Sequence, residues 1–411
     1  MSSCSNLVLD ESRKPISVYV HIPFCQTKCP YCDFNSYETS RAELLIRERA
    51  YIQALLREYG ALVDKYEIGN RFIESIFFGG GTPSLLSADS ISFLLEGFGG
   101  IFPLSEEVEI TLEANPRSVQ EDISSDKLIR LRQAGVNRLS FGAQSFLIDK
   151  LKFLGRNHSP KDTLLSYESA RSAGFNNINL DLIFGLKDEK SSQWKSELRE
   201  VVGLRPEHLS AYMLTIEPGT VFGRMSRKGE VFTSDENTSG ELFEITQEIL
   251  DSEGYCQYEI SNYQTGERVC KHNMVYWKGG EYLGLGAGAH SFLRAGNSYG
   301  LRWSNIPSPS MYVGRVNDTG LASQCMDPLD FDKAFIEYVA LGLRMAEGIP
   351  LATDFDNESS FTKELCALIE KEAPKGLVDD GYLNLDYSRI FIPRHKFGVS
   401  DAIIQSLIDC I

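Results

Sequence analysis

Three cysteines lie close together near the start of the chain, in a pattern suited to an iron–sulfur cluster. Cys25, Cys29 and Cys32 fall in the segment His-Ile-Pro-Phe-Cys-Gln-Thr-Lys-Cys-Pro-Tyr-Cys-Asp-Phe, which begins at His21. A disulfide would use two of these thiols and leave the third unpaired. A [4Fe–4S] cluster is normally bound by one thiolate at each iron, so three thiolates would leave one iron open to a ligand from outside the protein. A structural zinc ion prefers four ligands, and His21 is the nearby candidate for the fourth, so zinc binding is the weaker alternative.

The remaining six cysteines have no short spacings. In a reducing compartment, isolated thiols are most often small buried hydrophobic groups or inert surface groups, and we assign them no role. These residues are Cys4, Cys256, Cys270, Cys325, Cys366 and Cys410.

Three predicted strands each place a hydrogen-bonding side chain late in the strand, opposite the apolar stripe. These side chains are Glu113, Gln144 and Asp181. Any one of them could cap a helix or satisfy a loop amide. Proteins with parallel sheets bind their ligands at the carboxyl ends of the strands, however, so three such residues in register predict one shared site beside the cysteine loop.

A run of glycines follows the second predicted strand, in the segment Phe-Phe-Gly-Gly-Gly-Thr-Pro at 77–83. Consecutive glycines let a ligand approach backbone amides, and the proline can begin a helix. No Gly-Lys-Ser/Thr follows, so the segment is not a phosphate-binding P-loop. A second glycine-rich stretch, at 284–288, indicates close backbone packing.

Strands and helices alternate through the first half of the chain, which is typical of successive βαβ units and a parallel sheet. Gly135 and Gly174 each follow a predicted helix and fit its C-terminal cap. The predicted strands are 17–22, 75–78, 108–113, 138–144, 178–184 and 209–214, and the predicted helices are 44–59, 87–98, 125–134, 164–173 and 193–202.

The second half is less regular. It predicts a helix at 242–253 and a strand at 255–260, and after the turn Ile-Pro-Ser-Pro-Ser at 306–310 the pattern becomes mainly helical. We therefore expect three parts, at 16–220, 221–305 and 306–411. The last part is predicted to contain helices at 332–345, 363–372 and 400–408 and a short apolar ribbon at 382–392.

The composition excludes several classes of protein. The chain has 411 residues and a net charge of −16, with 41 basic and 57 acidic side chains. This balance argues against a nucleic-acid binder that works by neutralising phosphates. No apolar run approaches the roughly 18 residues of a transmembrane helix. The first fifteen residues lack the apolar or arginine-rich pattern of a targeting signal, so we expect a cytoplasmic protein without a transmembrane segment.

Several segments of the chain resemble a known family. The cysteine spacing after a first strand, followed by Gly-Gly-Gly-Thr-Pro, resembles the radical S-adenosylmethionine (SAM) superfamily, and further segments resemble its HemN/HemW branch. The resemblance implies a partial (β/α)6 barrel, of the radical SAM type, with a smaller, mainly helical, winged-helix-like C-terminal domain. The matching segments are 20–25, 78–83, 113–116, 141–146, 155–158 and 179–185.

The same resemblance implies the cofactors and their ligands. Cys25, Cys29 and Cys32 would bind the [4Fe–4S] cluster, and SAM would bind the open iron through its amino and carboxylate groups. A fork of hydrogen bonds from an arginine suits a carboxylate, and carboxylates suit ribose hydroxyls or an ammonium group. The positions matching the family's SAM contacts are Tyr19, Phe34, Gly80, Gly81, Thr82, Glu113, Gln144, Arg156 and Asp181.

Three features separate the functions found in this branch. The oxygen-independent coproporphyrinogen III dehydrogenases have a further cysteine two positions after the third, where this chain has Phe34, and a longer segment before the cluster loop. His-Asn-Met-Val-Tyr-Trp at 272–277 resembles the HNxxYW motif of the haem chaperones, and an imidazole is a good haem ligand.

We therefore expect a protein that binds haem and passes it to an acceptor protein. His272 is a candidate haem ligand, and the protein is expected to have an electron donor, which the sequence does not identify. His272 could instead be a structural side chain packed under its aromatic neighbours. Radical decarboxylation of coproporphyrinogen III is the alternative function, and a non-catalytic zinc protein is the second alternative.

Overall fold

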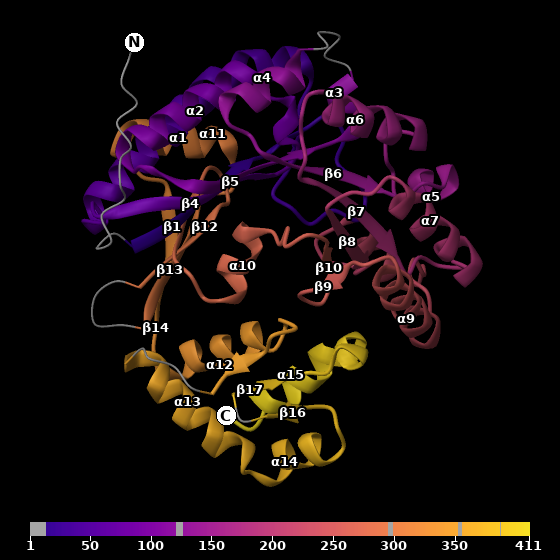
Figure 1. The fold of residues 1–411 in the computed structure, drawn as a ribbon. Coiled ribbons are helices and arrows are strands. Elements are labelled where there is room, and N and C mark those ends of the chain that lie inside the picture. Colours follow the sequence, from indigo (N-terminus) through magenta and orange to yellow (C-terminus); the bar gives the residue numbers. More distant parts are fainter. Residues whose placement is uncertain (1–13, 121–125, 295–298, 352–355, 387) are drawn as a thin grey trace.

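The structure is a computed structural model that describes residues 14–120, 126–294, 299–351, 356–386 and 388–411. A twelve-stranded sheet curves into an open barrel, and a smaller C-terminal lobe lies across the open side (Figure 1). The strand order is β14-β13-β12-β11-β1-β4-β5-β6-β7-β8-β10-β9.

Six neighbouring parallel strands form the centre of the sheet and correspond to the six strands predicted from the sequence. Their side chains toward the helices are almost wholly apolar and fully buried, Val18, Phe78 and Leu180 among them, as expected for strands covered by helices. The strands are β1 (Lys14–Ile22), β4 (Arg71–Gly80), β5 (Leu104–Ala114), β6 (Arg138–Gln144), β7 (Ile178–Phe184) and β8 (His208–Met213).

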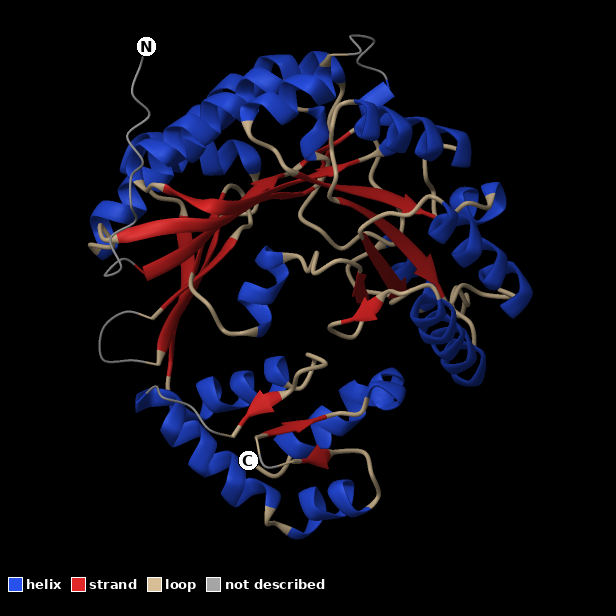
Figure 2. Ribbon diagram, in the orientation of Figure 1, coloured by secondary structure: helices blue, strands red, loops and turns tan. Residues whose placement is uncertain are grey.

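Helices cover the outer face of this parallel region (Figure 2). Ser40 and Ser159 begin two of them with capping boxes, in which the serine hydroxyl and an acidic side chain satisfy the free amides of the first turn. Gly135 and Gly174 have φ values of 118° and 88° just beyond their helices, as predicted. The covering helices are α1 (Arg41–Tyr66), α2 (Ala88–Ile101), α4 (Lys127–Ala134), α6 (Pro160–Ser172) and α7 (Ser191–Gly203). The predicted start of α4, residue 125, lies outside the described residues.

Both edges of the sheet continue beyond the parallel region. The strand predicted at 255–260 is shorter in the structure, where only β9 (Cys256–Gln257) lies in that range. The strand β10 (Asn262–Gln264) follows it after a turn in which the carboxylate of Glu259 accepts from the Ser261 amide. At the other edge, β11 (Tyr282–Leu285) runs parallel to β1, and three antiparallel strands follow. These are β12 (His290–Leu293), β13 (Gly300–Asn305) and β14 (Ser323–Leu329).

The sheet thus extends past residue 306, where the sequence pattern changes. Between β13 and β14, helix α11 (Pro309–Thr319) packs on α1, and the Tyr312 hydroxyl donates a 2.6 Å hydrogen bond to the buried carboxylate of Glu58. The remaining elements of this half are β2 (Phe24–Cys25), β3 (Tyr37–Glu38), η1 (Pro83–Leu85), α3 (Pro116–Gln120), α5 (Ile148–Phe153), α8 (Val221–Ser226), α9 (Glu236–Ser252) and α10 (Lys271–Trp277).

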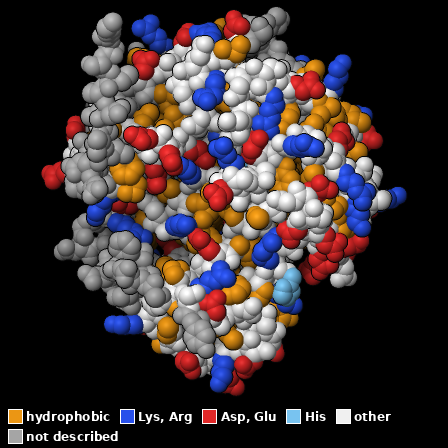
Figure 3. Space-filling view, viewed as in Figure 1, with side chains coloured by type: hydrophobic (Ala, Val, Ile, Leu, Met, Phe, Trp, Pro, Cys, Tyr) orange, Lys and Arg blue, Asp and Glu red, His pale blue; other side chains and the backbone are white. Residues whose placement is uncertain are grey.

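The C-terminal lobe combines helices with a small sheet of order β15-β17-β16. Its elements are α12 (Phe331–Gly342), β15 (Ile349–Pro350), α13 (Asp356–Ile369), α14 (Glu372–Asp379), β16 (Asn384–Leu385), β17 (Arg389–Phe391), η2 (Arg394–Val399) and α15 (Ser400–Ile408). None of the helices in the described ranges is long and apolar enough to cross a bilayer. Acidic and basic side chains are interspersed over the face shown in Figure 3.

Candidate functional site

A cavity of about 580 Å³ opens at the carboxyl ends of the parallel strands. Every residue that the family resemblance assigned to the cluster or to SAM lines this cavity, so residues from five strands and the cysteine loop meet in one place. The twelve residues are Cys25, Cys29, Cys32, Tyr19, Phe34, Gly80, Gly81, Thr82, Glu113, Gln144, Arg156 and Asp181.

The cysteine loop is positioned by the short pairing of β2 with β3 and by two hydrogen-bond donors from the barrel. The Thr82 hydroxyl lies 3.4 Å from Cys25 Sγ, and the guanidinium of Arg156 lies 3.6 Å from Cys29 Sγ. Burial raises the pKa of the Cys25 and Cys32 thiols. A raised pKa means that ionising the thiol costs free energy. Binding of iron would offset this cost, because a metal stabilises the thiolate and releases the proton.

The glycine run brings backbone close to the cysteine loop. A Cβ atom on Gly81 would lie 2.7 Å from the Phe24 carbonyl, 2.8 Å from the Ile22 carbonyl and 3.0 Å from Cys25 Sγ. These are backbone atoms and a cluster ligand, which cannot move aside as a flexible side chain could. Glycine is therefore required at this position, where the end of β4 meets the cysteine loop.

Two carboxyl groups, of Glu113 and Asp181, lie near each other inside the barrel. Burial, and then the nearby Asp181, raise the pKa of Glu113 to about 8, and burial also raises the pKa of Asp181. Glu113 accepts a 3.1 Å hydrogen bond from the Gly80 amide, and Asp181 accepts from Asn179 and Ser140 at 2.7 and 3.2 Å. Such a pair suits a ligand that brings hydroxyl donors or a positive charge.

Arg156 and Gln144 complete this wall of the cavity. Arg156 donates to the Gly142 carbonyl at 2.8 Å, while its buried Nε has no hydrogen-bond partner. Gln144 has a φ of 64°, which is rare for a residue with a side chain and is typical of functional positions held by their surroundings. An orphaned guanidinium nitrogen near the Cys29 thiol, in a cavity that Glu113 and Asp181 also line, fits an amino-acid-like ligand that also carries a ribose.

The environment of His21 does not favour the zinc alternative. Its Nδ1 lies 3.0 Å from the Tyr19 hydroxyl and its Nε2 lies 2.8 Å from the Asn35 carbonyl, so both nitrogens have partners within the protein. In the described part of the chain, no three His, Cys, Asp or Glu side chains converge closely enough to hold one metal ion. A cluster needs no such convergence, because each thiolate binds a different iron.

Several polar residues of the cavity were not predicted. Arg138, Ser140, Asn179 and Tyr212 line it beside the predicted residues. Arg138 is 2% exposed and lies 4.0 Å from Glu109, and its Nε has no hydrogen-bond partner. Strand alternation could have found some of these, since Arg138 and Ser140 share a face with Gln144, and Asn179 shares one with Asp181.

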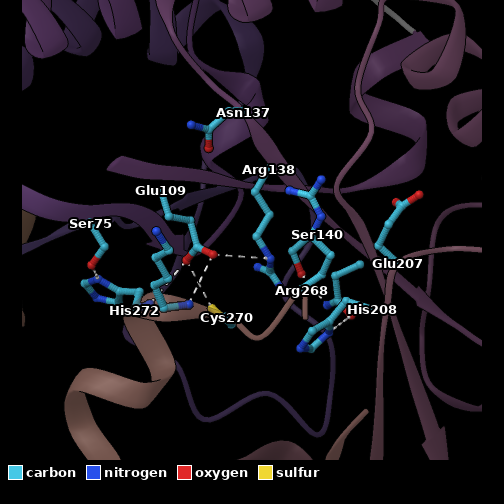
Figure 4. Close-up of polar contacts among 12 residues, drawn as sticks. Ser75, Glu109, Asn137, Arg138, Ser140, Glu207, His208, Arg268, Cys270 and His272 are labelled. Carbon is cyan, nitrogen blue, oxygen red and sulfur yellow. Dashed lines mark hydrogen bonds and ion pairs between the residues drawn. The ribbon is translucent and has the colours of Figure 1, made fainter. Parts of the chain in front are cut away.

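Helix α10, which carries the motif at 272–277, is anchored inside the barrel by Glu109 (Figure 4). The Glu109 carboxylate accepts hydrogen bonds from the backbone amides of Lys271 and His272 at 3.1 and 3.2 Å, and from Cys270 Sγ at 3.5 Å. A carboxylate at a helix N-terminus satisfies free amides and complements the helix dipole. Asn273, one residue further along, reaches the cavity.

His272 itself does not line the cavity and is 1% exposed. Its Nδ1 lies 2.8 Å from the Ser75 hydroxyl, its Nε2 lies 2.9 Å from the Tyr276 hydroxyl, and its ring stacks on Phe77 with centroids 5.2 Å apart. Burial lowers its pKa to about 3, so the ring is neutral. Both ring nitrogens are engaged, and neither is open to a haem iron in this arrangement.

The raised pKa of Glu113 predicts a pH dependence of SAM binding. In the ligand-free protein this carboxyl is protonated at neutral pH, and a hydroxyl donor or cation placed against it favours the ionised form, so binding releases the proton. The affinity of the reconstituted protein for SAM is expected to increase with pH until about pH 8 and then level off. In Glu113→Gln, which cannot ionise, this part of the pH dependence should disappear.

Equilibrium binding of SAM from about pH 6 to 9 measures this effect. The amino group of SAM titrates in the same range with both proteins, so the ratio of the wild-type to the Glu113→Gln affinity isolates the carboxyl. A ratio that stays constant with pH would contradict a role for Glu113 ionisation in binding.

Comparison with known proteins identifies the family of the chain. The family model described as the radical SAM superfamily matches residues 19–201. The protein named heme chaperone HemW from Escherichia coli (strain K12) is 40% identical over 82% of this chain and 84% of that protein. Radical S-adenosyl methionine domain-containing protein 1, mitochondrial, from Bos taurus is 32% identical over 95% of this chain and 87% of that protein.

The solved structure of coproporphyrinogen III oxidase (HemN) from Escherichia coli superimposes with a TM-score of 0.76 and covers 96% of this chain and 90% of that one. Its sequence identity is 23%, so this likeness concerns the fold, and it confirms the predicted radical SAM architecture with a mainly helical C-terminal part. The chain belongs to the radical SAM superfamily and, within it, to the HemW family.

Proposed function

We propose that this protein is a cytoplasmic haem chaperone, which binds haem and transfers it to acceptor proteins while it holds a [4Fe–4S] cluster and SAM. The observation that carries the proposal is its 36–40% identity, over four fifths of the chain, to two bacterial proteins named heme chaperone HemW. Radical SAM proteins use the cluster and SAM, and the cavity described above offers the residues that both require.

Within this proposal, Cys25, Cys29 and Cys32 bind three irons, and the other nine predicted residues hold SAM at the fourth. A reduced cluster, when bound, supplies an electron to the ligand at its open iron. Arg156 is placed to pair with the SAM carboxylate, since its unpartnered Nε lies beside the cysteine loop. Glu113 and Asp181 are placed to accept hydrogen bonds from the ribose.

Phe34 supports a chaperone over the dehydrogenase. Its side chain is 62% exposed at the rim of the cavity, at the position where the dehydrogenases are expected to have a further cysteine. Its backbone carbonyl accepts a hydrogen bond from Lys28 Nζ at 3.1 Å. An exposed phenyl ring cannot replace a thiol in redox or ligand chemistry, so coproporphyrinogen decarboxylation is the less supported function.

Haem binding and transfer test the proposal directly. We expect the anaerobically reconstituted protein to bind haemin saturably, with a shift of the Soret band, and to pass it to apomyoglobin as a generic acceptor. Absence of any saturable haemin binding would overturn the proposal. Conversion of coproporphyrinogen III to protoporphyrinogen in an anaerobic assay would establish the dehydrogenase function instead.

The structure changes what His272 is expected to do. Because both of its nitrogens have protein partners, we assign it the positioning of Tyr276, whose side chain lines the cavity. His272→Ala removes the partner of the Tyr276 hydroxyl and one of the two partners of the Ser75 hydroxyl, which keeps its 2.7 Å contact with Ser17. The variant is therefore expected to lower the free energy of unfolding by about 1–3 kcal/mol. Its Soret shift with haemin should stay like that of the wild type.

Thermal unfolding and haemin titration of His272→Ala measure both effects. His395→Ala, which changes an exposed histidine of the C-terminal lobe, is the matched control and should leave both unchanged. A stable His272→Ala protein that loses the Soret shift would show that His272 ligates haem after a rearrangement of α10.

A further inference from the structure

We propose that haem binds in a second cavity, on the opposite side of α10 from the SAM cavity. This cavity has a volume of about 590 Å³ and lies between the antiparallel strands β12–β14 and the first helix of the C-terminal lobe, α12. The volume falls within the range of small-molecule sites, about 300–1,000 Å³. The inference rests on the proposed function and assigns it a place in the molecule.

Aromatic and aliphatic side chains make up most of the lining, which suits a flat apolar macrocycle. Trp277, Phe292, Tyr299, Tyr338 and Phe361 all face the cavity. The Tyr299 and Phe361 rings stack with centroids 5.6 Å apart, and the buried Nε1 of Trp277 has no hydrogen-bond partner. Tryptophan and tyrosine of this kind offer both a flat apolar face and a polar edge to a ligand.

The charges at the edge of the cavity suit carboxylates. Four basic residues line it, Lys278, Arg294, Arg302 and Arg389, against two acidic ones, Glu337 and Glu347. Lys278 lies 3.0 Å from Glu347 and Arg389 lies 3.2 Å from Asp386, so part of this positive charge is already paired within the protein. Arginine pairs well with carboxylates, and haem carries its propionates along one edge of the macrocycle.

Arg302 is the best placed of these residues. Its guanidinium lies 4.8 Å from the centre of the Phe292 ring and 2.7 Å from the Glu337 carboxylate, while its buried Nε has no hydrogen-bond partner. A propionate could therefore bind to Arg302 while the macrocycle packs on the neighbouring rings. Without Arg302, the carboxylate of Glu337 would be left to repel the same propionate.

Helix α10 forms a wall shared by the two cavities and lies between the barrel and the C-terminal lobe (Figure 1). Asn273 and Tyr276 line the SAM cavity, whereas Trp277, the next residue, lines the second one. The motif that resembles the haem chaperones thus spans both sites. Because the sites are separate, haem and SAM are expected to bind at the same time.

Two variants and a modified ligand test this location. Ala334→Phe adds a ring to the cavity wall and is expected to weaken haemin binding at least tenfold, whereas Lys333→Phe, on the exposed side of the same helix, should not. Arg302→Gln is expected to weaken haemin binding about tenfold and to change the affinity for iron protoporphyrin dimethyl ester, which lacks free carboxylates, less than twofold. Thermal unfolding establishes that each variant is folded.

Competition with SAM separates the two cavities. We expect saturating SAM to leave haemin bound to the reconstituted wild-type protein, and haemin to leave the SAM affinity within twofold. Mutual displacement would place haem in the SAM cavity and overturn the inference. The inference would also be overturned if Ala334→Phe and Arg302→Gln were folded and bound haemin as tightly as the wild type. If the wild type binds no haemin at all, the proposed function fails.

Discussion

Cys29→Ala is expected to leave the protein without a [4Fe–4S] cluster after anaerobic reconstitution. Two thiolates cannot replace three at a cluster, and the Arg156 guanidinium, which lies 3.6 Å from Cys29 Sγ, would face an empty position. Iron and sulfide content should fall to background, and SAM binding through the open iron should be lost with it. Elemental analysis and the visible absorption of the reconstituted protein measure this result.

Cys256→Ala is the matched control, because this thiol is exposed and lies outside the cavity. It should reconstitute like the wild type. A Cys29→Ala protein that retains a full complement of iron and sulfide would show that the cluster is bound elsewhere.

Gly81→Ala is expected to weaken SAM binding about tenfold or more, although it adds a single methyl group. The new Cβ would lie within 3.0 Å of the Ile22 and Phe24 carbonyls and at 3.0 Å from Cys25 Sγ, so the strand or the cysteine loop has to shift. Overpacking of this kind typically costs about 1–3 kcal/mol. Isothermal titration of SAM into the reconstituted protein measures the loss.

Gly100→Ala controls for the loss of glycine flexibility. Gly100 lies near the end of α2, and a Cβ there would meet nothing within 4 Å. This variant should bind SAM normally and be slightly more stable, since alanine favours helix over glycine by about 1 kcal/mol. Equal SAM affinity in Gly81→Ala and the wild type would contradict the close approach of backbone and cysteine loop.

Much of the SAM cavity could be predicted from the sequence because parallel strands impose a simple geometry. Side chains alternate along each strand and the carboxyl ends meet at one edge, so the sequence alone predicts that Glu113, Gln144 and Asp181 lie together, and all three line the cavity. Strand alternation places Arg138 and Asn179 on the same faces as Gln144 and Asp181. They lie early in their strands, however, where a buried polar residue is easily taken for a structural group.

The second cavity could not be predicted, because it depends on tertiary packing. Its walls come from α10, from β12–β14 and from the C-terminal lobe, which follow one another between Trp277 and Arg389 but share no periodic pattern. The side chain of His272 was also unpredictable. A short motif does not reveal that Ser75 and Tyr276 occupy both nitrogens of the ring. The packing of α10 inside the barrel decides which of its residues line the SAM cavity and which line the second cavity.

Three thiolates are proposed to hold a cluster whose fourth iron binds SAM. Electron paramagnetic resonance of the reduced, reconstituted protein, recorded before and after the addition of SAM, tests it most directly. We predict a [4Fe–4S] signal that changes when SAM is added and that is absent in Cys29→Ala. A colourless, iron-free protein after oxygen-free reconstitution, or a cluster signal unaffected by SAM, would contradict the claim.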